Sequence, residues 1–326
     1  MIVGHDRAVE QFASAWPSRK LHHAWLLAGP KGVGKATFAQ AAARRVLADA
    51  AGPSFELRGI ETAADHPIVK LVEAGSHPDM RWLERLPKEK GDGLARDITI
   101  HQVRELGEFM GMTAALSPWR VAVIDSMDEL NREASNALLK MLEEPPANTL
   151  FFLVSHAPGR LLPTIRSRCR RLDFQRLEDD AMTSILEAQA PSLGAAERQR
   201  IIAISFGSAG RALAFAELEL ANLEDAALAI LRLGDPTNAR RSDLALELGK
   251  KAAAERYAAF LDLAPTLIAR EARQLDGSRR ERALDAYAKA RELAALAPRL
   301  SLDPSATVFQ IGGILAEVAE PASLKR

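Results

Sequence analysis

One short segment limits the possible folds more than any other. Gly29-Pro30-Lys31-Gly32-Val33-Gly34-Lys35 follows an apolar run that predicts a buried strand over residues 23–29, and it precedes an alanine-rich stretch that predicts a helix over residues 36–48. The glycines let backbone N–H groups converge on phosphate oxygens, and Lys35 can reach the terminal phosphates. A glycine-rich turn with a surface lysine is the alternative, which this strand and helix context disfavours. The segment therefore predicts a phosphate-binding loop.

Two further apolar runs, residues 120–125 and 149–155, also predict buried strands. Strands that are apolar throughout and separated by helices indicate a parallel sheet covered on both faces. Between them we expect a helix that Asn131 caps and Pro145-Pro146 stop. Residues 50–93 show weak periodicity, and we expect an inserted loop region with little regular structure.

After Phe174 the pattern predicts helix after helix. Residues 177–190 and 195–206 form amphipathic patterns broken at Pro191 and Gly207. Further helices are expected over residues 218–318, with breaks near 234–236, at 277 and over 298–304. A chain of 326 residues has room for two or three domains.

The residue after Lys35 departs from the full phosphate-loop pattern. A Ser or Thr normally follows the lysine and binds Mg²⁺ through its hydroxyl, but this chain has Ala36. Thr37 comes one step later, rotated by about 100° along a helix, so it should not simply substitute. Phosphate binding is expected, whereas a normal magnesium site is not.

The strand over residues 120–125 ends in Asp125, the position of the acid that supports the metal in phosphate-loop ATPases. Active enzymes of this type usually place a glutamate next, but this chain has Ser126, which cannot act as a general base at neutral pH without help. Asp128 and Glu129 lie beyond the strand end and should face solvent or begin the next helix. The nucleotide-binding candidates are Gly29, Pro30, Lys31, Gly32, Val33, Gly34, Lys35, Ala36, Thr37 and Asp125.

Four arginines, at positions 166, 168, 170 and 171, lie within six positions just before the strand-like residues 172–174. Most charge runs of this kind are solvated surface turns. The other interpretation is an arginine finger, a guanidinium that acts on ATP bound to another subunit and can be worth ~10³–10⁵ in rate. The residues alone leave both interpretations open.

Composition limits the remaining functions. Lys plus Arg and Asp plus Glu both total 43, so the net charge is zero and a protein that grips nucleic acid by itself is disfavoured. Cys169 is the one cysteine, which we interpret as a small buried residue in a reducing compartment. We see no signal peptide and no apolar run of membrane-spanning length, and we expect a cytoplasmic protein with no membrane partner. The tryptophans at 16, 25, 82 and 119 are too scattered for a base-stacking platform and are expected to pack.

Five motifs occur in order from the N-terminus to about residue 169: Ile2-Val3-Gly4-His5, residues 21–27 before the phosphate loop, Ser76-His77-Pro78-Asp79, residues 136–146 (NALLKMLEEPP) and Ser167-Arg168-Cys169. By these motifs the sequence resembles the bacterial clamp-loader subunits of DNA polymerase III, which are AAA+ proteins related to replication factor C. The His-Pro-Asp segment favours the delta-prime branch of that family over the gamma/tau ATPases. The specific match covers about residues 1–213, and later it rests on helical character and residues 300–313.

The resemblance implies an α/β P-loop NTPase domain of the RecA-like AAA+ type, a helical lid and an all-α collar that joins five subunits in a ring, over residues 1–173, 174–217 and 218–326. It implies that Arg168 is an arginine finger acting in trans on a neighbouring gamma subunit's ATP, with Arg166 as a helper. The implied partners are the gamma/tau and delta subunits, the sliding clamp and, through the assembled complex, primer-template DNA. The implied role is that of a stator in DNA replication, a component of the polymerase holoenzyme (a nucleotidyltransferase complex) with absent or very weak ATPase activity.

Two departures from the family pattern matter. Active relatives carry Gly-Ser-x-Arg at the lid helix, whereas here Gly207-Ser208-Ala209 is followed by Gly210, with Arg211 one position late. Many relatives hold a zinc with four cysteines after the first helix. This chain has none there, so we expect no zinc, and we interpret His66 and His77 as surface or packing residues.

Two other functions remain as alternatives to the stator. One is an active gamma/tau-like ATPase that uses Lys35 and Asp125, against which Ala36, Ser126 and Gly210 count together. The other is a nucleic-acid-binding module, which the zero net charge disfavours. ATP or ADP is the expected ligand of the loop if it still binds nucleotide, with magnesium disfavoured.

Overall fold

The computed structural model describes residues 2–16, 21–53, 59–88, 93–218 and 220–319. The chain folds into two compact units: residues 1–181 with 207–210, and residues 182–206 with 211–326. We call them the sheet unit and the helical unit. The boundaries expected at residues 173 and 217 stay a prediction.

A five-stranded parallel sheet organises the described residues of the sheet unit, in the order β2-β3-β4-β1-β5. Its strands are β1 (Ala24–Ala28), β2 (Met80–Leu83), β3 (Arg120–Asp125), β4 (Thr149–Ser155) and β5 (Arg170–Asp173). Every residue of β1 and β4 is buried, which matches the apolar runs and confirms the parallel sheet predicted from them.

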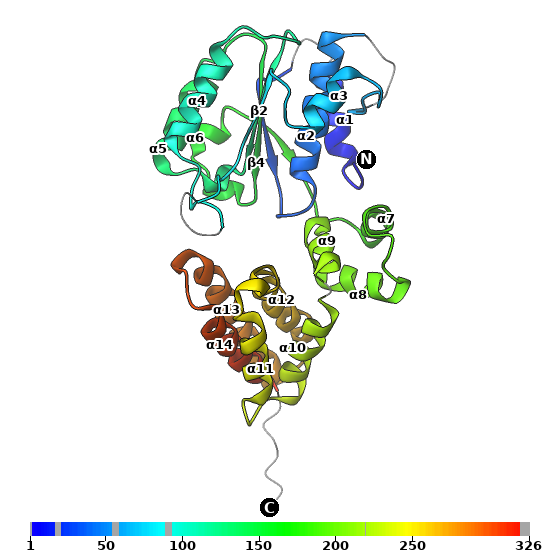
Figure 1. The fold of residues 1–326 in the computed structure, drawn as a ribbon, viewed down its shortest axis with the longest axis vertical. Helices are drawn as coiled ribbons and strands as arrows, with labels where there is room; N and C mark the ends of the chain where they lie inside the picture. Colours follow the sequence, from blue (N-terminus) through cyan, green and yellow to red (C-terminus); the bar gives the residue numbers. More distant parts are fainter. Residues whose placement is uncertain (1, 17–20, 54–58, 89–92, 219, 320–326) are drawn as a thin grey trace, which may run out of the picture. The chain divides into compact units, whose positions relative to one another are not determined.

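Helices cover both faces of this sheet (Figure 1). Alternate residues of the inner strands divide between two cores: Trp25, Leu27, Val123 and Phe152 pack with one set of helices, and Leu26, Ala28, Ile124 and Leu153 pack with the other. The first set is α1 (Asp6–Ala15), α2 (Lys35–Ala51) and α3 (Pro67–Glu73). The second set is α4 (Ile100–Gly111), α5 (Arg132–Glu143) and α6 (Pro163–Arg166).

The expected loop region over residues 50–93 was wrong in part, because it contains α3 and β2. β2 has only four residues, of which Leu83 alone is buried. The strand is held by the pairing of Met80–Leu83 with residues 121–124 of β3. Helix α3 is a single short element whose N-cap is His66. Neither element is long enough to leave a clear period in the sequence.

Short 3₁₀ turns link several of these elements: η1 (Met127–Glu129) after β3 and η2 (Pro158–Arg160) after β4. The predicted start of α5 is confirmed, since the Asn131 side chain accepts a 2.8 Å hydrogen bond from the Ala134 N–H. The helix ends at Glu143, before Pro145, as expected.

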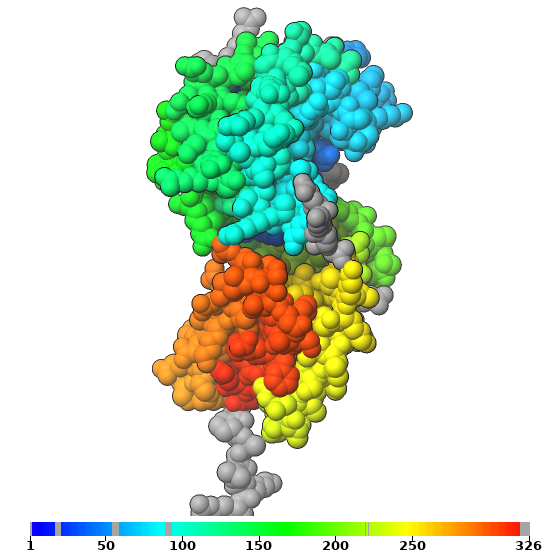
Figure 2. Space-filling model, turned by 60° about the vertical axis from the view of Figure 1, so that its left-hand side comes forward, coloured from blue at the N-terminus to red at the C-terminus, as the bar shows by residue number. Residues whose placement is uncertain are grey.

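Helices α7 (Asp179–Gln189), α8 (Ala195–Ser205) and α9 (Ala209–Glu217) follow, with the expected breaks at Pro191 and Gly207 confirmed. The remaining elements are α10 (Ala221–Leu233), α11 (Ala239–Leu248), η3 (Lys251–Ala253), α12 (Ala254–Ala272), α13 (Gly277–Leu300) and α14 (Pro304–Ala316). The break expected over residues 298–304 is confirmed, although α13 continues through Pro298 and ends only at Leu300. Helices α13 and α14 pack side by side and form the orange and red surface in Figure 2.

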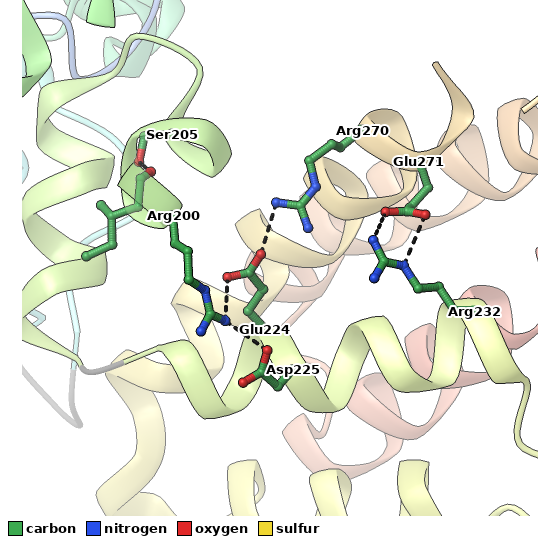
Figure 3. A network of polar contacts seen from close by, with 8 residues as sticks. Arg200, Ser205, Glu224, Asp225, Arg232, Arg270 and Glu271 are labelled. Atoms are coloured by element: carbon green, nitrogen blue, oxygen red, sulfur yellow. Dashed lines mark hydrogen bonds and ion pairs between the residues drawn. The ribbon is translucent and has the colours of Figure 1, made fainter. Parts of the chain in front are cut away.

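Ion pairs connect three helices inside the helical unit (Figure 3). Glu224 of α10 has a side chain that is 5% exposed, and it contacts Arg200 of α8 at 3.2 Å and Arg270 of α12 at 3.0 Å. A second pair joins Arg232 of α10 to Glu271 of α12 at 2.6 Å. A buried carboxylate needs such partners, so this network fixes α8 against α10 and α12.

Candidate functional site

The phosphate loop lies between β1 and α2, as the sequence predicts. Gly32 and Gly34 have φ angles of +76° and +104°, which L-residues with a side chain rarely adopt. The loop directly follows β1, which pairs with β4 on one side and β5 on the other. It therefore lies at the carboxyl edge of the sheet, where ligands of such folds bind.

Each carbonyl group from Gly29 to Gly34 accepts a hydrogen bond from the chain itself. The Lys35 ammonium donates to the carbonyls of Gly29, at 2.7 Å, and Pro30. The remaining donors are Ser208 Oγ to Lys31 at 3.1 Å, Gly210 N–H to Gly32 at 2.8 Å, His5 Nε2 to Val33 at 2.6 Å and Phe38 N–H to Gly34 at 2.9 Å. The carbonyls are thus engaged, so a phosphate placed at this loop would have to be bound by its backbone N–H groups.

His5 belongs to the first motif of the resemblance, and the structure gives it a supporting role. Its ring packs edge-on against Phe174, with ring centroids 4.8 Å apart, and only 6% of the residue is exposed. Because a carbonyl oxygen can only accept, Nε2 carries the hydrogen in the bond to Val33. Burial lowers the pKa of His5 below its ordinary value, which favours this neutral form.

Lys35 is 3% exposed, and burial lowers the pKa of its ammonium to about 8 although the carboxylates of Asp125 and Asp128 raise it. Asp125 ends β3, half-buried, and burial together with Glu129 and Glu84 raises its pKa. The two predicted residues are therefore electrostatically coupled across the carboxyl edge of the sheet. Ala36, the second residue of α2, has no hydroxyl, and Thr37 is exposed.

The residue after Asp125 offers no carboxylate. Ser126 is 2% exposed, and its hydroxyl has no hydrogen-bond partner within the described residues. Asp128 is exposed, as expected, and lies within η1, which begins at Met127. Its carboxylate accepts hydrogen bonds from the end of β4 and the residues after it: Ser155 Oγ at 3.0 Å, His156 N–H at 2.5 Å and Ala157 N–H at 3.1 Å. These bonds hold Asp128 in place as a structural acceptor.

Sequence reasoning missed His156, which directly follows β4. Burial and the positive charge of Lys35 lower its pKa to about 4, while Asp128 raises it. A neutral imidazole near the lysine and beyond a central strand is therefore part of this site. The sequence could have identified His156 as a site residue, because it directly follows an apolar strand that pairs with the strand leading into the loop.

The arginine turn, residues 166–171, is separated by the structure into distinct environments. Arg170 lies over the Trp25 ring at 4.8 Å, and Arg171 pairs with Asp173 at 2.8 Å, both from β5. Arg168 lies between α6 and β5, with 35% of its side chain exposed, and contacts Glu143 at 2.8 Å. Arg166 is exposed at the end of α6, and its guanidinium contacts no side-chain partner within the described residues.

Several residues interpreted as structural are confirmed as such. Cys169 donates to the Ile165 carbonyl at 3.1 Å, and burial raises the pKa of its thiol to about 12, so it is an unreactive packing group. The tryptophans pack: Trp25 is fully buried, and Trp16 and Trp119 contact each other edge-on at 5.4 Å. His66 accepts from Ile68 N–H at 3.3 Å as the N-cap of α3.

The His-Pro-Asp segment also has a structural role. Asp79 is 2% exposed, and its carboxylate accepts from the backbone N–H groups of Ala115, Leu116 and Ser117 at 2.6, 2.7 and 2.8 Å. His77 Nδ1 accepts from the Asp79 N–H at 3.0 Å. The segment thus anchors the chain that leads into β3.

Other predicted features are placed as follows. Arg211 donates to Thr266 Oγ1 at 3.3 Å inside the helical unit, and Gly210 lies against the phosphate loop. Within the described residues, no group of three or more His, Cys, Asp or Glu is placed to hold a metal ion. No described helix is both long and apolar enough to cross a bilayer.

The parallel sheet, the loop between β1 and α2 and the acid at the end of β3 define a P-loop NTPase domain of the AAA+ type, followed by helices. Residues 4–178 match the family described as DNA polymerase III, delta subunit, and the chain belongs to that family.

Curated relatives agree with this membership. The chain is 36% identical over 189 residues to DNA polymerase III subunit delta' of Pseudomonas aeruginosa, a match that covers 57% of this chain and 53% of the relative. It is 34% identical over 172 residues to the delta' subunit of Bacillus subtilis, covering 52% and 47%. It is 29% identical over 186 residues to the gamma subunit of Buchnera aphidicola, covering 57% and 47%. Each match thus spans about half the length of the relative.

Proposed function

We propose that this chain is the delta-prime, or stator, subunit of a DNA polymerase III clamp loader. In this role it docks in a five-subunit ring with gamma/tau and delta subunits, completes a neighbour's ATP site and helps to place a sliding clamp on primer-template DNA. Family membership and the greater identity to delta' than to gamma support this assignment. The division into sheet domain, lid and collar at residues 173 and 217 is part of the same proposal.

One observation carries the proposal. Arg168 keeps its guanidinium partly exposed in a turn fixed between α6 and β5, on a domain whose own site has Ser126 where an attacking water needs a carboxylate. A guanidinium held at a surface can stabilise the charge that develops on a phosphoryl group bound elsewhere. Arg168 is the proposed finger in trans and Arg166 its helper.

The chain's own loop is proposed to bind ATP or ADP without assembling an efficient magnesium site. The amide groups of residues 31–35 would hold the phosphates, and Lys35 would leave the carbonyls of Gly29 and Pro30 to reach them. The negative charge of a bound nucleotide would be attracted to the positive charge of this loop. With Ala36 and Ser126 in place of the usual hydroxyl and carboxylate, we expect negligible turnover by the isolated chain.

The test compares the isolated chain with the reconstituted ring. The isolated chain should show no ATP hydrolysis above a Lys35→Ala control, and Arg168→Ala should lower DNA-stimulated hydrolysis by the ring at least ~10-fold while the ring still assembles. Arg166→Ala should have a smaller effect. Robust magnesium-dependent hydrolysis by the isolated chain, or full ring activity with Arg168→Ala, would reject the stator role.

A further inference from the structure

We infer that Glu143 is the positioning residue for Arg168: it holds the guanidinium in the orientation from which the arginine acts on a neighbouring subunit's nucleotide. This inference rests on the proposed function of Arg168. The two residues lie on different elements, at the end of α5 and after α6, and Glu143 Oε1 contacts Arg168 Nη2 at 2.8 Å. Arg168 Nη1 also donates to the Thr164 carbonyl at 3.0 Å.

Both ends of this contact are built on fixed backbone. The residue before Glu143, Leu142, is 1% exposed, and its carbonyl accepts a 3.0 Å hydrogen bond from Nε2 of His23, the residue just before β1. On the other side, the Arg168 N–H donates to the Ile165 carbonyl at 3.1 Å, and Ile165 is also 1% exposed. The two side chains therefore start from fixed backbone positions, and their contact restricts a guanidinium that would otherwise sample many rotamers.

Glu143 does not stabilise its own helix, α5. A negative charge in the last turn of a helix opposes the helix dipole, so a carboxylate at the end of α5 weakens the helix slightly. Glu144, the next residue, is also exposed and contacts no side-chain partner within the described residues. The contact with Arg168 is thus the feature that distinguishes two adjacent glutamates.

The contact is also weak enough to allow function. The side chains are 35% and 42% exposed, so water screens the pair and its release costs little. Arg168 Nη1 also lies 3.5 Å from Ser167 Oγ, and the N–H groups that are not used on Glu143, Thr164 and Ser167 remain for a phosphate. Glu143 therefore orders the arginine without sequestering it.

The test uses the reconstituted ring and the steady-state rate of ATP hydrolysis. We expect Glu143→Ala to lower kcat by about 3- to 10-fold, the cost of ordering one long side chain at the moment of reaction, with KM for ATP unchanged. Glu143→Gln keeps an acceptor oxygen of the same reach and should lie between wild type and Glu143→Ala. Glu144→Ala is the matched control and should behave as wild type.

A double variant separates positioning from a general structural effect. In a ring that already carries Arg168→Ala, the further change Glu143→Ala should lower kcat no more, because nothing is left to position. Equal losses in both backgrounds, or no loss from Glu143→Ala alone, overturn the inference while leaving the finger intact. A ring whose kcat ignores Arg168→Ala rejects the proposed function and the inference together. Ring assembly is confirmed for every variant by size-exclusion chromatography.

Discussion

The backbone N–H of Gly210 donates a 2.8 Å hydrogen bond to the carbonyl of Gly32, in the middle of the phosphate loop. The approach is so close that a Cβ atom at position 210 would lie 3.2 Å from the α-carbon of Gly32. By the family resemblance, active relatives carry an arginine at this position. The absence of a side chain at position 210 therefore permits the close contact with Gly32. The arginine of this chain, Arg211, lies one position later and donates a hydrogen bond to Thr266.

A larger residue at position 210 should separate the start of α9 from the loop. We expect Gly210→Leu to reduce the free energy of unfolding of the sheet unit by about 1–3 kcal/mol, because overpacking forces the backbone apart. Urea unfolding followed by tryptophan fluorescence measures this, since all four tryptophans lie in the sheet unit. Gly111→Leu is the control, because a Cβ there meets nothing within 4 Å. Equal stability of the two variants would contradict the close contact.

Asp79 should be a large contributor to the stability of the sheet unit. Burial raises the pKa of its carboxyl, but the N–H donors of residues 115–117 and His77 together lower it below 3.8. We expect Asp79→Asn to cost about 2 kcal/mol at pH 7, since hydrogen bonds to a charged acceptor are strong. A depressed folded-state pKa gives stability that is present above the unfolded value and lost as pH falls through the folded value. The difference between wild type and variant should therefore shrink below about pH 4.

The same urea unfolding experiment measures this difference across the acid range. Asp65→Asn is the control, because Asp65 is exposed and contacts no side-chain partner in the described residues. A difference that stays constant from pH 7 to strongly acidic pH would show that the ionised form of Asp79 contributes nothing.

Lys35 should make the sheet unit more stable as the solution becomes alkaline. Burial lowers its pKa from 10.5 to about 8, so between these values the unfolded chain binds the proton more tightly than the folded chain does. The free energy of unfolding contributed by this residue therefore rises with pH over that window, and the penalty is fully present below pH 8. Relative to Lys35→Met, wild type should gain on the order of 2 kcal/mol between about pH 7 and pH 9.5. A difference independent of pH would mean that the lysine keeps its ordinary pKa.

The ion pairs around Glu224 should differ in strength according to burial. Arg200 contacts both Glu224 and Asp225, whose side chains are 5% and 63% exposed. We expect Glu224→Ala to destabilise the helical unit by about 3 kcal/mol, because Arg200 and Arg270 lose a buried partner. Asp225→Ala should cost less than about 1 kcal/mol, as exposed pairs do. Circular dichroism at 222 nm follows the helices, and unchanged tryptophan fluorescence transitions would place the loss in the helical unit; similar losses for both variants would contradict the role of burial.

Much of the sheet unit could be predicted from local sequence. The runs at residues 120–125 and 149–155 became β3 and β4 with those bounds, and Asn131 and Pro145 limit α5 as expected. These features depend on apolar continuity, capping and proline, which act within a few residues. β2 and α3 were missed because they are short and are stabilised by pairing and packing with distant residues.

The residues of the candidate site also fall into those that local sequence predicted and those that it did not. The glycines, Lys35 and Asp125 were recognisable because a phosphate loop is a contiguous segment and its acid ends an apolar strand. His156, the three N–H groups that bind Asp79 and the partner of Arg168 were not, since each involves residues that lie far apart in the sequence.

The sequence by itself determined the loop, the substitutions Ala36 and Ser126 and the crowd of arginines, because residue identity and local spacing carry that information. Only the tertiary structure decided that Glu143 is the carboxylate partner of Arg168 and which residues donate hydrogen bonds to the loop's carbonyls. Those relationships depend on how β1, α5 and α6 pack around one sheet, and packing brings together groups whose sequence positions do not reveal their proximity.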